Sequence, residues 1–405
     1  MILLKGNIMT ENLFGMYIHW GIYAMTGLQE QALVRYSMKK EDYEGLVKKF
    51  NPTKYNAEKW VRKAKKAGVE YICFTTKHHD GFCMWDTKYT DYKITNTPYG
   101  KDILKELADA CQKYGMRLSL YYSNPDWNYP KGYNPNTSHQ WYAVNKDAPD
   151  LDNYREYIKN QITELLTNYG KIYTFFWDIP PCVEDKSLNE LVRKLQPGIH
   201  INDRGWDTGD FSTPEREYQS SDGKRFTRMT EACNSVGEQS WGYRKNEDFY
   251  SIRFLLSSID KMMAMGASYI LNVGPDEKGV IQKAYYKRFN KVAKWYRKYK
   301  HTLKAGEDSF DYGVVHNEYI ATKDDKNTYL HFYNGLISDS VAISNYPSVP
   351  KSVTLLNTGK ELEYCVELLP EFCEFEEGKA LKYLHFRGIP IDKLSNEPII
   401  IEIKW

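Results

Sequence analysis

The strongest constraint on the fold is a repeat in which an amphipathic helix is followed at once by a buried strand. Residues 56–68 place their apolar side chains on one helical stripe and end at Gly68, and the apolar run "VEYICFTTK" follows directly. The same unit recurs with "MRLSLYYS", "KIYTFFWD", "GIHIND" and "ASYILNVGP" as its strands. Repetition over roughly 280 residues predicts an α/β fold, a (β/α)8 TIM-like barrel, whose usual size is about 250 residues.

The repeat fades in one part of this region. Between Arg204 and Trp241 no helix-then-strand unit is visible, so the sixth and seventh strands are expected there only by exclusion. A doubly wound α/β fold is the alternative, but no glycine-rich phosphate loop follows the first strand, which disfavours it.

The last hundred residues follow a different pattern. After a predicted helix over 282–299, short alternating strands such as "NTYLHFY", "SVTLLN" and "PIIIEIKW" are separated by turn residues. This pattern predicts a small C-terminal antiparallel β-sandwich. We therefore expect two domains, a barrel over 1–304 and a sandwich over 305–405.

The charge and aromatic content narrow the class of partner. The 55 basic and 53 acidic residues give a net charge of +2, so the sequence predicts neither a nucleic-acid nor a membrane partner. The 34 Tyr and 10 Trp suit a protein that stacks flat rings against a polar ligand with an apolar face, such as a sugar. Core filling accounts for the same rings equally well.

The cysteines and the N-terminus bear on the compartment. Seven scattered cysteines contain no C-x-x-C pair, so we expect reduced thiols rather than a disulfide framework or a zinc site. The start of the chain has too short an apolar run for a signal peptide. The sequence thus predicts a cytoplasmic protein, or a secreted or periplasmic one if a leader has been removed. It gives no expectation for the oligomeric state.

Polar and aromatic residues gather where the predicted strands end. They are His19 and Trp20 after the first strand, Lys77, His78, His79, Asp80 and Trp85 after the second, Tyr121, Tyr122, Asp126 and Trp127 after the third, Trp177 and Asp178 after the fourth, and Asn202, Asp203 and Arg204 after the fifth. The carboxyl ends of barrel strands form the active face. A single Asp at a strand end is usually a loop cap, but so many together predict a site.

Two carboxylates with separate roles are the minimum for cleaving a glycosidic bond. Asp178 follows a hydrophobic run and is the expected nucleophile. Its acid/base partner should come from another loop, and Glu215, Glu217 and Glu231 are all candidates. The residue pattern alone does not choose among them.

The pair His78-His79 raises the alternative of a metal-dependent hydrolase. Adjacent residues on a strand face opposite ways, whereas metal-binding histidines usually alternate so that both rings point to one side. We therefore expect no metal and no cofactor, and interpret the histidines as hydrogen-bonding groups for sugar hydroxyls.

At these residues the sequence resembles glycoside hydrolase family 29, the α-L-fucosidases. The segments "FGMYIHWGIYAM", "AGVEYICFTTKHHDGFCMWDTKYTDYKI", "YYSNPDW", "INDRGWDTGDFSTPE", "SWGY" and "YILNVGPDEKG" each resemble family segments in the right order. The resemblance covers about 13–299, and "KHHDGF" is its most specific element. It implies retaining, exo-acting hydrolysis of terminal α-linked L-fucose through a covalent intermediate.

The resemblance also implies roles for individual residues. Asp178 matches the family's nucleophile. Residues that match sugar-binding positions, or that offer apolar contact to the sugar, are His19, Trp20, His78, His79, Trp85, Tyr121 or Tyr122, Arg204 and Trp241. Trp20 has an alternative role in packing the barrel. For the acid/base, the resemblance favours Glu231, with Glu215 as the alternative used by other members.

Two departures from the family pattern raise an alternative function. The Glu-Trp usual after the first strand is replaced, with Ala32-Leu33 expected in its place and Gln31 or Tyr36 as substitutes for the contact. The glycine common after the nucleophile is Ile179 here. The alternative is a catalytically impaired homologue that binds fucose. Linkage preference is not predicted.

Overall fold

The computed structural model describes residues 12–129, 151–181, 185–216, 225–370 and 380–405. The chain divides into two compact units. The first comprises Met1–Arg216, Arg228–Tyr250 and Tyr269–Ala293, and the second comprises Glu217–Thr227, Ser251–Ser268 and Lys294–Trp405. Helix α7 and the end of α8 thus belong to the second unit, whereas we expected them in the barrel domain from the sequence. The predicted domain boundary at residue 304 stays a prediction.

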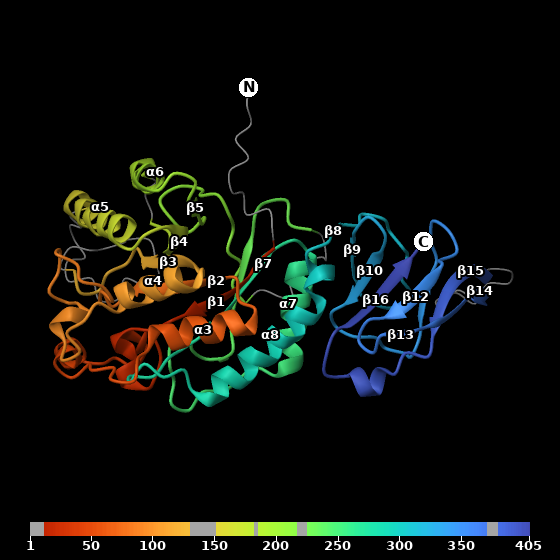
Figure 1. Ribbon diagram of the computed structural model, residues 1–405, viewed down its shortest axis with the longest axis horizontal. Helices are drawn as coiled ribbons and strands as arrows, with labels where there is room; N and C mark the ends of the chain where they lie inside the picture. The colour runs from red at the N-terminus through yellow and green to blue at the C-terminus, as the bar shows by residue number, and fades with distance from the viewer. Residues whose placement is uncertain (1–11, 130–150, 182–184, 217–224, 371–379) are drawn as a thin grey trace, which may run out of the picture. The chain divides into compact units, whose positions relative to one another are not determined.

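The first unit is built on a parallel sheet with the strand order β5-β4-β3-β2-β1-β7-β6 (Figure 1). Its strands are β1 (Phe14–Ile18), β2 (Tyr71–Lys77), β3 (Arg117–Ser123), β4 (Ile172–Asp178), β5 (His200–Ile201), β6 (Glu231–Ser235) and β7 (Ser268–Val273). β1 and β2 are buried along their whole length. This explains why they appear in the sequence as continuous apolar runs.

Residues 211–216 connect the two edges of this sheet. Isolated parallel bridges join Asn202 to Phe211, at the end of β5, and Glu215 to Cys233, on β6. The segment therefore stands where the sixth strand of a (β/α)8 barrel belongs, between β5 and β6. Because it pairs through single bridges and no helix among the described residues flanks it, its sequence lacks the helix-then-strand repeat.

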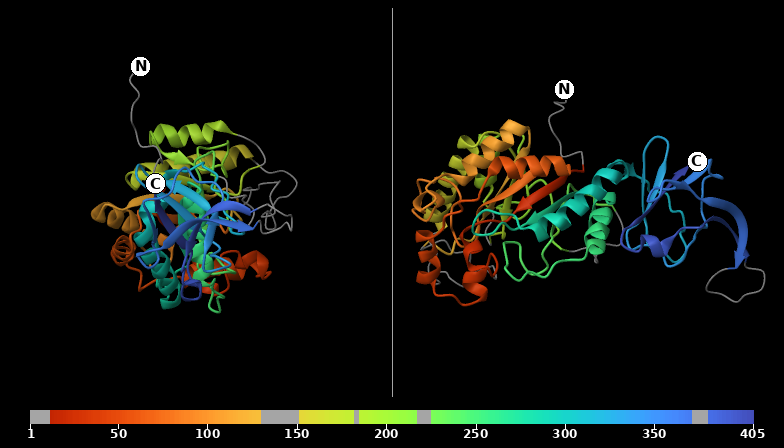
Figure 2. Two further views of the ribbon diagram at one scale, coloured as in Figure 1. Left: turned by 90° about the vertical axis from the view of Figure 1, so that its right-hand side faces the viewer. Right: turned by 60° about the horizontal axis from the view of Figure 1, so that its bottom comes forward.

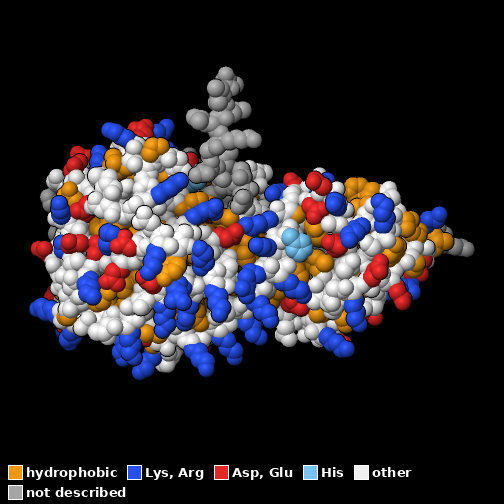
Figure 3. Space-filling view, in the orientation of Figure 1, with side chains coloured by type: hydrophobic (Ala, Val, Ile, Leu, Met, Phe, Trp, Pro, Cys, Tyr) orange, Lys and Arg blue, Asp and Glu red, His pale blue; other side chains and the backbone are white. Residues whose placement is uncertain are grey.

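Helices of the first unit cover the outside of the sheet. They are α3 (Ala57–Ala67), α4 (Ile103–Tyr114), α5 (Leu151–Asn168) and α6 (Lys186–Leu195), after the short α1 (Ala32–Arg35) and α2 (Lys40–Glu44), whereas α7 (Ile252–Ala264) and the end of α8 (Lys283–Leu303) belong to the second unit. Helix α3 begins at Asn56, whose side chain accepts from the Lys59 amide, and ends at Gly68 in the left-handed region, as the sequence predicts. Its outward side is basic, and Figure 3 shows Lys and Arg gathered over α3 and α8.

In the described part of the first unit, 3-10 turns lie at Ile22–Thr26, Gly45–Lys48 and Ile94–Asn96, and another lies at Ile391–Leu394 in the second unit. In the second view of Figure 2, helices α3 and α4 lie along the strands of the first unit. Helices α3 and α4 are neighbours and pack against each other. No helix among the described residues is both long and apolar enough to span a bilayer.

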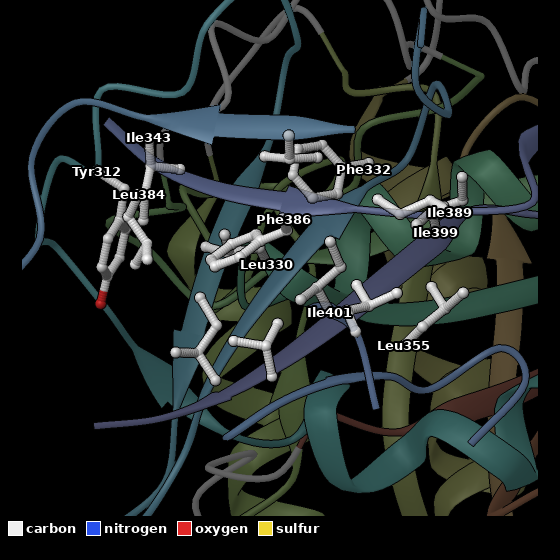
Figure 4. Close-up of a cluster of buried hydrophobic side chains, with 14 of the residues drawn as sticks. Tyr312, Leu330, Phe332, Ile343, Leu355, Leu384, Phe386, Ile389, Ile399 and Ile401 are labelled. Atoms are coloured by element: carbon white, nitrogen blue, oxygen red, sulfur yellow. The ribbon is translucent and has the colours of Figure 1, made fainter. Parts of the chain in front are cut away.

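The second unit contains two antiparallel sheets. One has the order β13-β12-β16-β10-β9-β8 and the other β11-β15-β14. The strands are β8 (Gly306–Glu307), β9 (Ile320–Lys323), β10 (Thr328–Phe332), β11 (Val341–Ile343), β12 (Ser352–Leu355), β13 (Lys360–Glu361), β14 (Glu363–Pro370), β15 (Ala380–Arg387) and β16 (Ile399–Lys404). Leu330 and Ile401 of one sheet and Leu384 and Phe386 of the other share one buried core (Figure 4). This is the predicted β-sandwich.

The cysteines of the described residues are free thiols. Cys73, Cys83, Cys111 and Cys233 are buried and Cys365 is exposed. Cys182 and Cys373, expected to be reduced as well, lie outside the described residues.

Candidate active site

A polar cavity of about 390 Å³ opens at the carboxyl ends of the barrel strands. The sequence-predicted residues that line it come from seven different strand ends or loops. They are His19, Gln31, His78, His79, Tyr121, Asp178, Arg204, Glu215 and Trp241. Barrel geometry thus brings together residues spread over more than half of the chain.

Asp178 is the last residue of β4, and neighbouring groups fix both of its carboxylate oxygens. The Tyr121 hydroxyl donates to Oδ2 at 2.8 Å, and Arg204 Nη1 donates to Oδ1 at 3.2 Å. The Asn124 amide donates to the Asp178 carbonyl at 3.0 Å, and its side chain donates to the Ile179 carbonyl at 2.9 Å. These contacts hold Asp178 toward the cavity and hold Ile179 at a φ of 60°.

Glu215 faces the same cavity from the end of the 211–216 segment. Its Oε2 accepts from Arg204 Nη1 at 2.7 Å, so one guanidinium nitrogen bridges Glu215 and Asp178. The two oxygens that share this nitrogen can be no farther apart than these two bonds laid end to end, so the carboxylates of Asp178 and Glu215 lie close together. Although burial lowers the pKa of Arg204, the carboxylates of Asp178 and Glu215 raise it above its ordinary value.

His19 is oriented by Asn272 of β7. Asn272 donates through its side-chain amide to the Trp241 carbonyl at 2.6 Å, which leaves its oxygen to accept from His19 Nδ1 at 2.8 Å. Burial lowers the pKa of His19 to about 4. The ring is therefore neutral at ordinary pH, and Nε2 is left as an acceptor for a ligand hydroxyl.

His78 and His79 line the cavity together, contrary to the prediction that they face opposite ways. Strand β2 ends at Lys77, so both histidines lie in the following turn, where strand alternation no longer applies. Their ring centroids are 4.2 Å apart, and His79 Nε2 lies 3.7 Å from Asp178 Oδ2. The Ser123 hydroxyl donates to the Pro125 carbonyl and so accepts from His79 Nδ1 at 2.6 Å.

His78, His79 and Asp178 form the group among the described residues whose donor atoms could hold a metal ion, since they lie within 4.8 Å of one another. Both oxygens of Asp178 already accept from Arg204 and Tyr121. A cation held by this group would lie beside the positive guanidinium of Arg204, which repels it, so the donor set fits a metal poorly.

Glu231 does not line the cavity, which corrects the preference for it over Glu215. It is the first residue of β6, and parallel strands begin at the end of the barrel opposite the active face. Its carboxylate is buried and accepts from the hydroxyl of Tyr71, the first residue of β2, at 2.6 Å. Burial raises the pKa of Glu231 to about 7, so a shifted pKa here marks a sealed position rather than a site. Glu217 lies outside the described residues.

Four aromatic residues predicted to contact the sugar lie elsewhere. Trp20 is fully buried and donates to the Asp276 carbonyl at 2.9 Å, in agreement with its alternative packing role. Trp85 is fully buried and donates to Glu164. Tyr122 is buried beside Lys77, and Tyr36 is 46% exposed outside the cavity. A large ring after a strand predicts burial as readily as ligand contact.

Several residues that line the cavity were not predicted from the sequence. They are Tyr17, Gln29, Glu30, Arg35, Phe176, Ile179, Arg216, Cys233 and Gln239. Glu30 is the most informative, because its Oε2 accepts from the backbone amides of Trp241 and Gly242, both at 2.9 Å. The sequence led us to expect Ala32-Leu33 in the place of the family's Glu-Trp. The residues that stand at the cavity are instead Glu30 and Gln31. Ala32 and Leu33 are buried in α1.

A (β/α)8 barrel whose strand ends bring two carboxylates close together in one polar cavity is the arrangement of retaining glycoside hydrolases. The α-L-fucosidase family model matches residues 7–301. The chain therefore belongs to the α-L-fucosidase family.

Proteins similar to this chain in sequence, and others similar in structure, are α-L-fucosidases. Plasma α-L-fucosidase of Homo sapiens is 26% identical over 315 residues, covering 70% of this chain and 65% of the relative. The chain thus spans somewhat less than two thirds of that relative's length. α-L-Fucosidase isoenzyme 1 of Paenibacillus thiaminolyticus superposes with a TM-score of 0.80 at 28% identity, covering 98% of this chain and 97% of the other.

A third relative carries chemical information of its own. An α-L-fucosidase of Bacteroides thetaiotaomicron, trapped as a covalent intermediate with 2-fluoro-fucosyl fluoride, superposes with a TM-score of 0.74 at 26% identity. The match covers 97% of this chain and 94% of that one.

Proposed function

We propose that the protein is an exo-acting, retaining α-L-fucosidase that removes terminal α-linked L-fucose. The observation that carries this proposal is the Arg204 bridge between Asp178 and Glu215 in the cavity, because it keeps two carboxylates at the short separation that double displacement needs. Family membership and the covalent intermediate of the Bacteroides relative support the same reaction.

Asp178 attacks the anomeric carbon while Glu215 gives a proton to the departing glycosidic oxygen. A covalent fucosyl ester with Asp178 results, and the leaving alcohol departs. Glu215 then takes a proton from water, whose oxygen attacks the same carbon and releases Asp178. Two inversions leave the anomeric configuration retained.

The remaining cavity groups bind and orient the sugar. His19 and His79 each have one ring nitrogen fixed by Asn272 or Ser123, so the other nitrogen accepts from a hydroxyl. Trp241 offers a ring to the apolar face of the sugar. The cavity, of about 390 Å³, is large enough to receive a terminal sugar residue.

The test of the proposal is hydrolysis of an aryl α-L-fucoside followed by proton NMR, with α-L-fucose as the expected first product. Glu215→Ala should lose activity and regain part of it with azide, yielding fucosyl azide. Glu231→Ala is the matched control and should show no azide rescue. Rescue of Glu231→Ala but not of Glu215→Ala would overturn the assignment, and binding of fucose without any turnover would establish the impaired homologue instead.

A further inference from the structure

Three arginines line the cavity, and they differ in their partners. Arg204 is engaged by Asp178 and Glu215. Arg35 Nε donates to the side-chain oxygen of Gln31 at 2.7 Å, and Arg216 Nη1 donates to the Glu238 carbonyl. Within the described ranges, neither Arg35 nor Arg216 forms an ion pair with a carboxylate.

The carboxylates that line the cavity already have ion-pair or hydrogen-bond partners within the protein. Asp178 and Glu215 share Arg204, and Glu30 accepts from the 240–242 segment. Over the described residues, the hydrogen-bond partners of the Arg35 and Arg216 guanidinium groups are an amide oxygen, a carbonyl and the Tyr250 hydroxyl, while Glu247 interacts with Arg216 only electrostatically. Each guanidinium therefore keeps donor atoms for a ligand. Such a planar donor fork matches a carboxylate or sulfate.

Arg216 also occupies an unfavourable backbone position. It follows Glu215 directly and has a φ of 56°, held by its amide donating to the Cys233 carbonyl at 3.1 Å. A left-handed conformation is unfavourable for a residue with a side chain, and Gly or Asn would occupy it more readily. The Arg216 guanidinium lies 4.7 Å from the Trp241 ring centroid, which fixes the charge on one wall of the cavity.

Arg35 is exposed, so it lies at the opening, whereas Asp178 is 13% exposed and lies deeper. In an exo-acting enzyme the terminal sugar occupies the deep part, and the leaving group extends through the opening. Arg216 lies against Trp241, whose amide donates to Glu30, and Arg35 donates to the neighbouring Gln31. Both charges thus lie on the wall formed by residues 30–31 and 241, past which the leaving group extends.

We propose that this side of the cavity recognises fucosides whose leaving group carries an anionic substituent, a carboxylate or a sulfate, through Arg35 and Arg216. This inference rests on the proposed function. It assigns the two arginines to substrate selection rather than to bond cleavage.

The experiment compares fucosides that differ only in charge. The probes are 4-(carbamoylmethyl)phenyl, 4-(carboxymethyl)phenyl and 4-(sulfomethyl)phenyl α-L-fucoside, and the quantity is the ratio of kcat/KM for each anion to that for the neutral amide. The wild type should favour an anion about fivefold at low salt, a typical gain for partly exposed charges, and lose the preference near 0.5 M NaCl. The sulfonate, which stands in for a sulfate, and the carboxylate distinguish the two anions.

Arg216→Gln and Arg35→Gln should each lower this ratio toward one, while Arg117→Gln, at the start of β3 and the opposite end of the barrel, should keep it. A wild-type ratio of one, or a ratio that neither glutamine variant changes, overturns the inference while leaving the fucosidase intact. Loss of turnover on all three probes would instead refute the proposed function, and this inference with it. The salt dependence of the wild type decides the matter if a variant does not fold.

Discussion

Two clusters of charge lie at strand ends in the same barrel and differ in their access to the cavity. Lys77 Nζ lies 3.0 Å from Asp126, and the two side chains are 0% and 2% exposed. Arg204 lies at similar distances from Asp178 and Glu215, but these side chains are 21%, 13% and 37% exposed. The first cluster is sealed and the second lines the cavity.

The sealed cluster is saturated by fixed partners. Lys77 also donates to the Tyr122 hydroxyl at 3.0 Å, and Asp126 accepts from the backbone amides of Asn128 and Tyr129. At Gly81, with a φ of 80°, an added Cβ would fall 2.1 Å from Asp126, so the neighbouring turn fits only glycine. The ion pair between Lys77 and Asp126 therefore fixes the turn that carries His78 and His79. The groups of the open cluster can exchange their partners for a ligand. Burial therefore distinguishes an ion pair that stabilises the fold from one that can take part in ligand binding or catalysis.

The largest expected effect is in the open cluster. Asp178→Gly removes the proposed nucleophile and should lower kcat on an aryl α-L-fucoside by roughly 10⁴-fold or more, without lowering the melting temperature. Stopped assays and thermal melting of the same samples measure the two quantities. Near wild-type turnover in this variant would remove Asp178 from the mechanism.

Breaking the sealed cluster should have the opposite signature. Lys77→Met leaves Asp126 buried without its cation, which should lower the free energy of unfolding by about 3–5 kcal/mol. Urea unfolding measures this loss. If the variant is as stable as the wild type but inactive, Lys77 belongs to the chemistry and the contrast between the clusters fails.

A smaller effect is expected at Glu231, a third buried charge. Burial raises its pKa from 4.5 to about 7, so the folded protein keeps a proton that the unfolded chain releases between these values. The resulting stability is present at acid pH and is lost as the pH rises through 7, a change of about 3 kcal/mol.

Glu231→Gln should therefore show a smaller fall in stability between pH 5 and pH 8 than the wild type. The fall should persist in part, because burial also raises the pKa of Asp80 and Glu247 to about 7. Urea midpoints at both pH values provide the measurement. An unchanged fall would mean that Glu231 does not hold the proton.

The smallest effect concerns Ile179, a β-branched residue at a φ of 60° beside the nucleophile. Ile179→Gly should relieve the backbone and raise the free energy of unfolding by about 1 kcal/mol. Ile179→Ala keeps the strain and removes most of the side chain, so it separates the two causes. Equal stability of the two variants would show that the backbone conformation costs nothing.

The fold was predictable because the helix-then-strand repeat is local. The site was predictable only in part. Asp178, His19 and Arg204 follow strands that the sequence defines, so their placement in the cavity could be predicted. Glu215 lies in the irregular 211–216 segment and Glu231 begins β6, and the single bridges that join the two leave no periodic trace in the sequence. The end of the barrel at which each glutamate lies depends on how residues 211–216 pair with β6.

Other errors have equally physical causes. The position of Lys77 as the last residue of β2 decides that His78 and His79 turn to the same cavity, and strand ends are not sharply defined by sequence. Trp20 and Trp85 are buried because large rings stabilise a core as well as they bind a ligand.

One side-chain oxygen has a consequence for how the enzyme is made. Glu30 and the Trp241 amide that it accepts from are separated by 211 residues. During synthesis the aromatic wall cannot take its place until most of the chain has left the ribosome, because contacts so distant in sequence form late. A nascent chain that ends before this segment would carry Asp178 yet have no finished pocket in which to use it.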